Sequence, residues 1–578
     1  MKLNAATCTD GYKLSHASMY ADGTNKVYSN LTPRSDRIYR ANSATKFYDG
    51  RLVWIGAQGA VQEVKEMWDD FFRSDKETVV KKFARRMAGY LGGFDPAVKV
   101  IGELHDVGYL PLQIKSLPEG VKVKFGTPVM TVTNTLPQFY WLVNYLETVI
   151  SALTWKSATS ATIAAEYKAI CEHYAELTGT DAFTVSIQCH DFSMRGMSGP
   201  EDSARTGLGH LTQFIGTDSL PAMDYAEAYY DADPDSLIAI SVPATEHAVA
   251  TSNILYLEEN MCDGGYVLNS RLAAETMFME DLITRKFPTG IVSYVADSFD
   301  FWAVLTEILP ALKETILARQ ASAVAPGKLV IRPDSGDPVK VVCGYTWSGN
   351  VYTSEEELRA VTHSQYNNSW SDKDGWVKNC DIDKEVVNIN GVFYKCHLDG
   401  HDFVKASMND IVPECEVKGA IQLLWETFGG TVTDKGYKML DSHIGLIYGD
   451  SITTKRAEEI LRRLMDKGFA SGNVVFGVGS YTYQCVTRDT FGFAIKATYT
   501  EVDGEGVVIF KDPKTDSKKK SARGLLFVGY NTDGGYVLED DVTPEEEASD
   551  DNKLQEIFVD GEFTSRTSLE DIRIRLSK

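Results

Sequence analysis

Residues 328–336 read KLVIRPDSG, a short apolar run that ends in a cluster of charged and glycine residues. The same pattern recurs from about residue 180 onward, and each run precedes a segment with helical periodicity. The other runs are FTVSIQCHDF (183–192), LTQFIGTD (211–218), LIAISVP (237–243), GIVSYVADS (290–298), IGLIYGDS (444–451) and NVVFGVGS (473–480). Strands that alternate with helices form parallel βα units, so this pattern decides the fold class.

Seven such units in succession fit a closed or nearly closed barrel better than an open sheet. We therefore expect an α/β fold with a TIM-like (β/α) barrel, whose strand ends converge on one face that carries the active site. Each polar cluster is also explained as the cap of the next helix, because Asp and Ser are good N-caps. Seven clusters rich in Asp, Arg and His favour a site over capping alone.

The two ends of the chain do not follow this alternation of strands and helices. Residues 1–180 carry strand signals and long helices such as ATIAAEYKAICEHYAELTG (161–179), and residues 489–578 add strands and an acidic linker, EDDVTPEEEASDD (539–551). We expect these two ends to form a second α+β sheet domain together, with the barrel domain at 181–488.

Residues 342–416 interrupt the barrel pattern before the apolar helix AIQLLWETF (420–428) and are rich in Asn, Asp, Gly and aromatic residues. We interpret them as an insertion, in which NINGVFYK (388–395) predicts a hairpin with an Asn-Gly turn. A zinc site there is conceivable, although no paired CxxC spacing supports it. Its ligands would come from Cys343, Cys380, Cys396, His397, His401 and Cys415.

Composition excludes several classes of protein. The net charge of −23 over 578 residues argues against bulk nucleic-acid binding. Nine cysteines without a CxxC pair indicate reduced thiols in a cytoplasmic protein. The N-terminus lacks the apolar segment of a signal peptide. The apolar stretch 139–155 is too short for a membrane span and predicts a buried helix.

The strand-end residues suggest a phosphorylated substrate. Arg332 with Asp297, Asp300, Asp334 and Asp450 supplies one cation and several carboxylates. Gly449, Gly477, Gly479 and Ser480 supply open backbone, which suits a phosphate at a strand-to-helix turn. Arg488, Lys496 and the basic run 510–524 stand out in an acidic chain, although a solvated loop explains that run equally well. The aspartates suit ribose hydroxyls or Mg²⁺.

His247 follows a strand end in LIAISVPATEHAVATS (237–252) and opens the next helix. It could be a core residue, a metal ligand or a catalyst. The pairs His105-Asp106, His190-Asp191 and His401-Asp402 raise the alternative of a metal phosphohydrolase. They fall on unlike segments, however, and no HxH pair ends a strand, so we disfavour a hydrolytic metal site.

The motifs CHDFSMRG, GTDS, SVPATEH, ADSFD, IRPDSGDP, YGDS and FGVGS…TRD, in this order, resemble the nicotinamide phosphoribosyltransferase family, the type II phosphoribosyltransferases of NAD salvage. The opening TDGYKLSH…KVYSNLTPR and the late FKDP match as well, so only 342–416 has no counterpart. The resemblance implies a homodimer with shared active sites. It also implies a Mg²⁺-dependent reaction of nicotinamide with 5-phosphoribosyl-1-pyrophosphate that gives nicotinamide mononucleotide and pyrophosphate.

The resemblance also implies roles for single residues. The nicotinamide ring would stack between Phe192 and the partner subunit's Tyr12, with Asp218 accepting from the amide, Arg195 on its oxygen and Asp10 nearby. His247 would be phosphorylated by ATP and oriented by Asp297, and these two with Asp334 form the expected catalytic set. Mg²⁺ would be carried mainly by pyrophosphate. The expected phosphoribosyl and pyrophosphate contacts are Arg34, Arg332, Asp334, Ser335, Gly336, Gly449, Asp450, Gly479, Ser480, Arg488, Lys496 and Lys511.

Two departures from the family and three alternatives stay open. GVGSYT has fewer glycines than vertebrate relatives carry, and Ala494 replaces a serine near the phosphates. The first alternative is a nicotinate phosphoribosyltransferase, against which Asp218 speaks because a carboxylate repels nicotinate. The second is a non-catalytic binding protein on the same scaffold, and the third is a metal-dependent barrel hydrolase.

Overall fold

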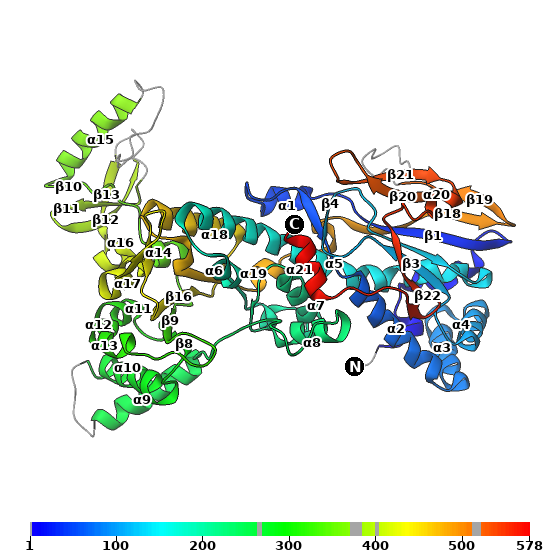
Figure 1. The fold of residues 1–578 in the computed structure, drawn as a ribbon, viewed down its shortest axis with the longest axis horizontal. Helices are drawn as coiled ribbons and strands as arrows, with labels where there is room; N and C mark the ends of the chain where they lie inside the picture. Colours follow the sequence, from blue (N-terminus) through cyan, green and yellow to red (C-terminus); the bar gives the residue numbers. More distant parts are fainter. Residues whose placement is uncertain (1–2, 263–268, 370–383, 399–403, 511–521) are drawn as a thin grey trace. The chain divides into compact units, whose positions relative to one another are not determined.

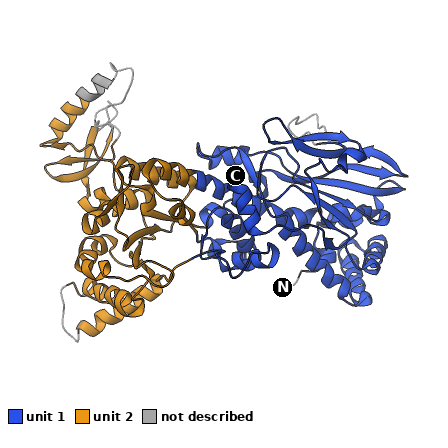
Figure 2. Ribbon diagram, viewed as in Figure 1, with its two compact units in different colours: residues 1–169, 191–240, 480–578 blue, residues 170–190, 241–479 orange. Residues whose placement is uncertain are grey.

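The computed structural model describes residues 3–262, 269–369, 384–398, 404–510 and 522–578 (Figure 1). It divides into two compact units (Figure 2). Unit 1 comprises Met1–Ala169, Asp191–Ile240 and Ser480–Lys578, and unit 2 comprises Ile170–His190 and Ser241–Gly479. The domain limits expected near residues 180 and 488 stay a prediction.

Unit 1 is built on a seven-stranded antiparallel sheet in the order β19-β18-β1-β5-β3-β22-β23. Its strands come from both ends of the chain (Figure 1), and β1 pairs with β5 on one side and with β18 on the other. The strands are β1 Thr24–Pro33, β3 Leu112–Ser116, β5 Met130–Asn134, β18 Phe493–Val502, β19 Glu505–Val508, β22 Gln555–Val559 and β23 Glu562–Phe563. Two smaller pairs are β2 Arg51–Trp54 with β4 Val121–Lys124, and β20 Leu525–Tyr530 with β21 Tyr536–Val542.

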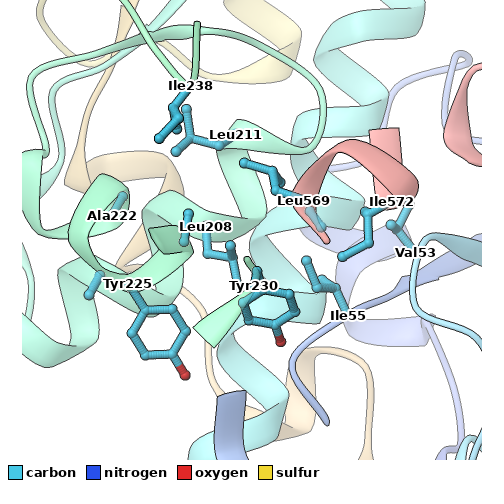
Figure 3. Packing of buried hydrophobic residues seen from close by; sticks show 13 residues of the cluster. Val53, Ile55, Leu208, Leu211, Ala222, Tyr225, Tyr230, Ile238, Leu569 and Ile572 are labelled. Atoms are coloured by element: carbon cyan, nitrogen blue, oxygen red, sulfur yellow. The ribbon is translucent and has the colours of Figure 1, made fainter. Parts of the chain in front are cut away.

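The helices of unit 1 bury a core of residues that are far apart in the sequence. Figure 3 shows Val53, Leu208, Tyr230 and Leu569 packed together, and each is at most 2% exposed. Truncating a side chain as buried as Leu208 to alanine typically costs roughly 2–5 kcal/mol. These helices are α1 Arg37–Asn42, α2 Ala57–Arg73, α3 Lys76–Leu91, α4 Asp95–Val107, α7 Pro200–Leu211, α8 Leu220–Tyr229, α19 Ser480–Tyr483, α20 Pro544–Glu547 and α21 Leu569–Leu576.

Unit 2 carries a curled parallel sheet with the strand order β17-β16-β9-β8. Its strands are β8 Ile291–Val295, β9 Lys328–Arg332, β16 Ile444–Tyr448 and β17 Val474–Val478. All four were expected from the sequence, and the structure confirms them. The fold is therefore mixed α/β with parallel strands that alternate with helices.

Unit 2 also contains helices and short strands. The helices are α6 Ala182–Ile187, α9 His247–Cys262, α10 Ser270–Asp281, α11 Phe301–Ala303, α12 Leu309–Ala311, α13 Lys313–Leu317, α14 Pro338–Cys343, α15 Glu355–Ser369, α16 Glu414–Lys418, α17 Ala420–Phe428 and α18 Thr454–Asp466. The short strands β14 Gly430–Val432 and β15 Lys438–Leu440 form a hairpin. Among the described residues, no helix combines the length and the apolar character that a membrane crossing requires.

The insertion forms a small four-stranded sheet, β10-β11-β12-β13, with a core of its own. The strands are β10 Val351–Tyr352, β11 Val386–Ile389, β12 Val392–Leu398 and β13 Val404–Val412. The predicted Asn-Gly turn is confirmed, because Asn390 (φ 53°) and Gly391 (φ 85°) join β11 to β12. Both dihedral angles are positive, as a two-residue hairpin turn requires.

The two ends of the insertion meet at a pair of glycines, Gly344 and Gly419, which we call the glycine neck. Both have left-handed backbones, with φ of 75° and 77°. A Cβ on Gly419 would lie 2.2 Å from the backbone nitrogen of Gly344, so only glycine allows this approach. The insertion thus begins after α14 and ends before α17, within unit 2.

Three of the seven expected strands are wrong in extent. Residues 183–187 are helical in α6, because the Asp181 side chain caps the Thr184 amide at 2.9 Å and overrides the β propensity of this run. Only β6 Cys189–Asp191 and β7 Gly216–Thr217 remain of the first two runs. The run 237–243 makes one isolated bridge, at Ile240, and no strand, and Pro243 in it has no N–H to donate.

Two other expectations are also corrected. The two helices expected at 139–155 and 161–179 are one helix, α5 Tyr140–Thr178, in which Thr159 and Ser160 hydroxyls bond carbonyls four residues back. The supposed acidic linker 539–551 contains the end of β21 and helix α20. The N-terminal segment is a 3₁₀ helix, Gly11–Ser18, anchored by buried Lys13.

Candidate functional site

In unit 2, polar residues follow four parallel strands at one edge of the sheet. Val295 of β8 pairs with Arg332 of β9, so the two strands end level with each other. Because parallel strands point the same way, the residues after their C-terminal ends share this edge. The residues that follow the strand ends are Asp297, Asp334, Asp450 and Gly479.

His247 is the first residue of α9 and lies against the end of β8. Its Nε2 is 3.7 Å from Asp297 Oδ1, and its Nδ1 is 3.3 Å from Ser298 Oγ. The imidazole is 47% exposed, whereas the Asp297 side chain is 5% exposed. His247 is therefore neither a core residue nor part of a histidine cluster among the described residues. It presents its ring to solvent beside a buried carboxylate.

Asp297 links His247 to the loop that follows β9. Its Oδ2 accepts a hydrogen bond from the Asp334 backbone N–H at 3.0 Å. Its Oδ1 is buried and has no hydrogen-bond partner among the described residues. The separation from His247 is long for a hydrogen bond but within ion-pair range. The carboxylate thus holds the Asp334 loop with one oxygen and faces the imidazole with the other.

Arg332 is fixed by a residue that sequence reasoning missed, Thr245. The Arg332 Nη2 donates to the Thr245 carbonyl at 2.8 Å, and the Thr245 hydroxyl accepts from the Val295 amide at 2.9 Å. Arg332 Nε is buried without a partner among the described residues. An unsatisfied buried donor typically costs about 1–3 kcal/mol, so a guanidinium with a spare donor suits an anionic ligand. Thr245 stands in SVPATEH, where its burial could not be read from the motif.

Tyr448, the last residue of β16, is a second residue that the sequence did not single out. Its buried hydroxyl donates to the carbonyls of Ser335 and Gly336, both at 3.0 Å. Burial raises the pKa of Tyr448, and the nearby carboxylates of Asp450 and Asp297 raise it further. The phenol therefore stays neutral and holds the loop after β9. The sequence feature that could have identified Tyr448 is its position directly before Gly449 and Asp450.

The exposed polar groups of this edge come from the same loops. Asp334, Ser335 and Gly336 are exposed, as is Asp450, while Gly449 is partly buried. Ser451 has a positive φ of 48°, which turns the chain sharply after Asp450. The edge thus presents carboxylates, backbone and one cation to the solvent.

Unit 1 holds the residues that were expected to contact nicotinamide. The Asp191 carbonyl accepts from the Asp218 amide at 3.0 Å, which places Asp218 beside the segment that carries Phe192 and Arg195. Asp218 and Arg195 are exposed, and Phe192 is partly buried. A Cβ on Gly196 would lie 2.2 Å from Ser480 Oγ, so Ser480 packs against this segment.

A pocket of about 430 Å³ in unit 1 contains Arg488 and a lysine that sequence reasoning missed. Lys156, in the middle of α5, donates to the Tyr483 carbonyl at 2.8 Å and to Gln484 Oε1 at 3.1 Å. Burial lowers the pKa of Lys156, although Asp202 at 3.7 Å opposes the shift. Lys156 thus anchors the chain that follows the glycine-bearing turn at 477–480.

The residues expected from the partner subunit are exposed in unit 1. Asp10 accepts from the Thr148 hydroxyl at 2.7 Å, Tyr12 is 65% exposed, and Arg34 Nε donates to the Gly492 carbonyl at 2.9 Å. Lys496 is exposed on β18, where it pairs with Asn30 of β1. Lys511 lies outside the described residues.

No group of three His, Cys, Asp or Glu side chains in the described part of the chain is arranged to hold a metal ion. The zinc ligands considered in the insertion include Cys343, which is buried and donates to the Ile460 carbonyl. Burial raises the pKa of Cys343 to about 12, so this thiol stays protonated and is a poor metal ligand. Cys380 and His401 lie outside the described residues.

Comparisons of the sequence with known proteins agree on one family. The model of the nicotinate phosphoribosyltransferase (NAPRTase) family matches residues 187–562. A protein of Acinetobacter baylyi named nicotinamide phosphoribosyltransferase is 44% identical over 580 residues, which cover 100% of this chain and 98% of the relative. A Mycoplasma pneumoniae protein of the same name is 31% identical and covers 89% and 93%. A crystal structure of human nicotinic acid phosphoribosyltransferase covers 98% and 93% at 15% identity, with a TM-score of 0.45.

Proposed function

The chain belongs to the nicotinate phosphoribosyltransferase family, and from this we propose that it joins nicotinamide to 5-phosphoribosyl-1-pyrophosphate, giving nicotinamide mononucleotide and pyrophosphate. The observation that carries the proposal is the group of charged residues at the C-terminal ends of β8 and β9. There Asp297 accepts a hydrogen bond from the Asp334 loop, and Arg332 keeps a buried donor that has no partner in the described part of the chain. This set offers a cation for phosphate and carboxylates for ribose hydroxyls.

The reaction is a displacement at the anomeric carbon of the ribose. The C–O bond to pyrophosphate breaks and the pyridine nitrogen forms the new C–N bond, so no strong general base is needed. In our proposal Asp334 and Asp450 position the ribose, while Arg332, Arg488 and Lys496 contact the phosphates. Arg34 of the partner subunit and Lys511 would complete the pyrophosphate contacts. Ser335, Gly336, Gly449, Gly479 and Ser480 supply backbone and hydroxyl donors.

Asp218 supports the amide as substrate. A carboxylate accepts from the amide N–H₂ of nicotinamide but repels the carboxylate of nicotinate. Phe192 and the partner subunit's Tyr12 would orient the ring by stacking, with Arg195 on the amide oxygen and Asp10 nearby. The names of the two relatives, which both specify nicotinamide, support the same choice.

We further propose that ATP phosphorylates His247. The γ-phosphoryl group would leave ADP and form a P–N bond to a ring nitrogen of the exposed imidazole. Asp297, 3.7 Å from Nε2, would orient the ring and stabilise positive charge on it. The phosphorylated side chain would then favour binding of the phosphoribosyl substrate at the adjacent loops.

Three finer features complete the proposal. The parallel sheet would form part of a (β/α) barrel with the active site at its mouth. Two copies of the chain would form a homodimer in the cytoplasm and share their active sites. Mg²⁺ would reach the site bound to pyrophosphate, because the described side chains offer no three-ligand metal site; when bound it would neutralise the leaving group.

One assay tests this proposal. The protein is mixed with 5-phosphoribosyl-1-pyrophosphate, Mg²⁺ and either nicotinamide or nicotinate, with and without ATP, and mononucleotide is measured. We expect product from nicotinamide and a higher rate with ATP. Product from nicotinate alone would identify the acid-specific activity instead. No product from either base would favour a binding protein on this scaffold.

A further inference from the structure

A cavity of about 880 Å³ in unit 2 lies where the insertion, with α16 at its C-terminal end, meets α17 and α18. Its volume is in the range of pockets that hold small organic ligands. One wall belongs to the insertion and includes Tyr345, Trp347 and Phe393, while the facing wall includes Arg463 and Lys467 of the α18 region. None of these residues belongs to the proposed active site.

The insertion wall is aromatic and firmly supported. The rings of Trp347 and Phe393 meet edge to face, with centroids 5.0 Å apart and an interplanar angle of 90°. Phe393 is buried in a cluster with Val386 and Val417, and Tyr345 packs against this cluster. Trp347 Nε1 donates to the Asn350 carbonyl at 3.0 Å, yet the residue is 37% exposed. A rigid, partly exposed indole suits the flat face of a base.

The facing wall is cationic. The cavity lining contains five Lys or Arg and three Asp or Glu side chains, in a protein whose net charge is −23. Arg463 is held by Glu385 at 2.8 Å and by Glu459 at 2.7 Å, which fixes its guanidinium in place. Arg462 is fixed in the same way by Glu459 and Asp466.

Lys467 is the cation in this wall that has no carboxylate within ion-pair distance among the described residues, although the charge of Glu385 favours its ammonium form. Its ammonium donates to the carbonyls of Cys343, Val417 and Lys418, and it makes no ion pair with any residue that the structure describes. Burial lowers the pKa of Lys467, which reports the cost of keeping its charge away from water. A phosphate in the cavity would offset that cost.

We propose that this cavity is a second ligand site, separate from the active site, which binds a nucleotide. The base would stack on Trp347, and the phosphate would lie toward Lys467 and the arginines of α18. Aromatic stacking together with a cationic wall is the combination that recognises a planar base linked to phosphate. Neither feature alone would select this class of ligand.

The test is calorimetric titration of the full-length protein with AMP, with adenosine and inorganic phosphate as fragment controls. The Arg332→Ala variant separates the two sites, because it disables the proposed phosphoribosyl site only. We expect AMP to bind wild type and Arg332→Ala equally and more tightly than either fragment. Trp347→Ala should weaken binding about tenfold, as loss of one stacked base contact does.

Lys467→Met should weaken AMP binding as well, and exposed Lys435→Met is the matched control that should leave it unchanged. Thermal unfolding of each variant reports folding, and Trp347→Ala keeps the test decisive if Lys467→Met unfolds. The proposal is overturned if AMP does not bind, or if Trp347→Ala binds it like wild type. It is also overturned if Arg332→Ala alone abolishes binding, or if phosphate binds as tightly as AMP.

Discussion

The imidazole of His247 is half-exposed beside an almost fully buried carboxylate, and this contrast argues for a reactive group. We expect His247→Ala to keep basal synthesis of mononucleotide and to lose the stimulation by ATP, because the anomeric displacement needs no imidazole. The measurement is initial rate with and without ATP at subsaturating 5-phosphoribosyl-1-pyrophosphate. ATP stimulation that persists at the wild-type level would exclude the phosphohistidine.

Asp297→Asn checks the same mechanism from the neighbouring residue. The substitution removes the charge that faces the imidazole and keeps the size of the side chain. We expect weaker labelling of His247 by radioactive phosphate from ATP, with folding unchanged in thermal unfolding. Wild-type labelling in this variant would show that Asp297 does not orient the ring.

Tyr448 contributes to the site by holding the loop that follows β9 in place. Its hydroxyl bonds two consecutive carbonyls of the loop that carries Asp334, so Tyr448→Phe removes these bonds and keeps the ring. The single hydroxyl hydrogen is shared between the two carbonyls, and a hydrogen bond of this kind is worth about 0.5–1.5 kcal/mol, which predicts a rise of roughly 2- to 13-fold in KM for 5-phosphoribosyl-1-pyrophosphate. We expect kcat to change much less. A fall in kcat with KM unchanged would contradict a positioning role.

At the scale of elements, the sequence predicted what depends on local pattern. The strands β8, β9, β16 and β17 carry apolar runs that end in polar clusters, and all four form as expected. The Asn390-Gly391 turn was equally readable, because its dihedral angles follow from residue type. The run at 183–187 has the composition of a strand but is helical, since one capping aspartate outweighed β propensity.

The candidate site residues also divide into those that the sequence predicts and those that it does not. Charged residues at strand ends, such as Asp297 and Asp334, could be found because their chemistry stands out in an apolar context. Thr245, Tyr448 and Lys156 act through backbone carbonyls or amides that only the folded chain brings near. No residue pattern encodes such a partner, so these three could not be identified from the sequence.

The glycine neck makes the insertion a removable element. We expect a chain in which two glycines replace residues 345–418 to fold, because Gly344 and Gly419 already touch. The variant loses Glu385 as the partner of Arg463 and two of the carbonyls that hold Lys467, so a drop in stability of about 1–3 kcal/mol is expected. Thermal unfolding and mononucleotide synthesis measure the outcome. An insoluble or inactive product would show that the insertion supports the parallel sheet.

At the scale of the whole molecule, the proposed homodimer with shared sites predicts complementation between inactive variants. In this arrangement Arg34 contributes to the active site of the partner subunit, whereas Asp334 belongs to the active site of its own subunit. Arg34→Ala and Asp334→Asn therefore disable different parts of the shared site. Each variant alone should be nearly inactive. After equal mixing and subunit exchange, half of the dimers are mixed and have one intact site, so about a quarter of wild-type activity should return. A mixture as inactive as its parts would show that each chain builds its site alone.

The position of β1 in its sheet also sets an order of events during synthesis. Asn30 of β1 bonds the Lys496 carbonyl, 466 residues later in the chain. All of unit 2 has been synthesised once residue 479 is added, before β18 is made. One edge of β1 therefore stays unpaired until β18 has been translated. Unpaired strand edges readily form hydrogen bonds with other chains, which leads to aggregation. The seven-stranded sheet of unit 1 is thus completed only when the last hundred residues have been made.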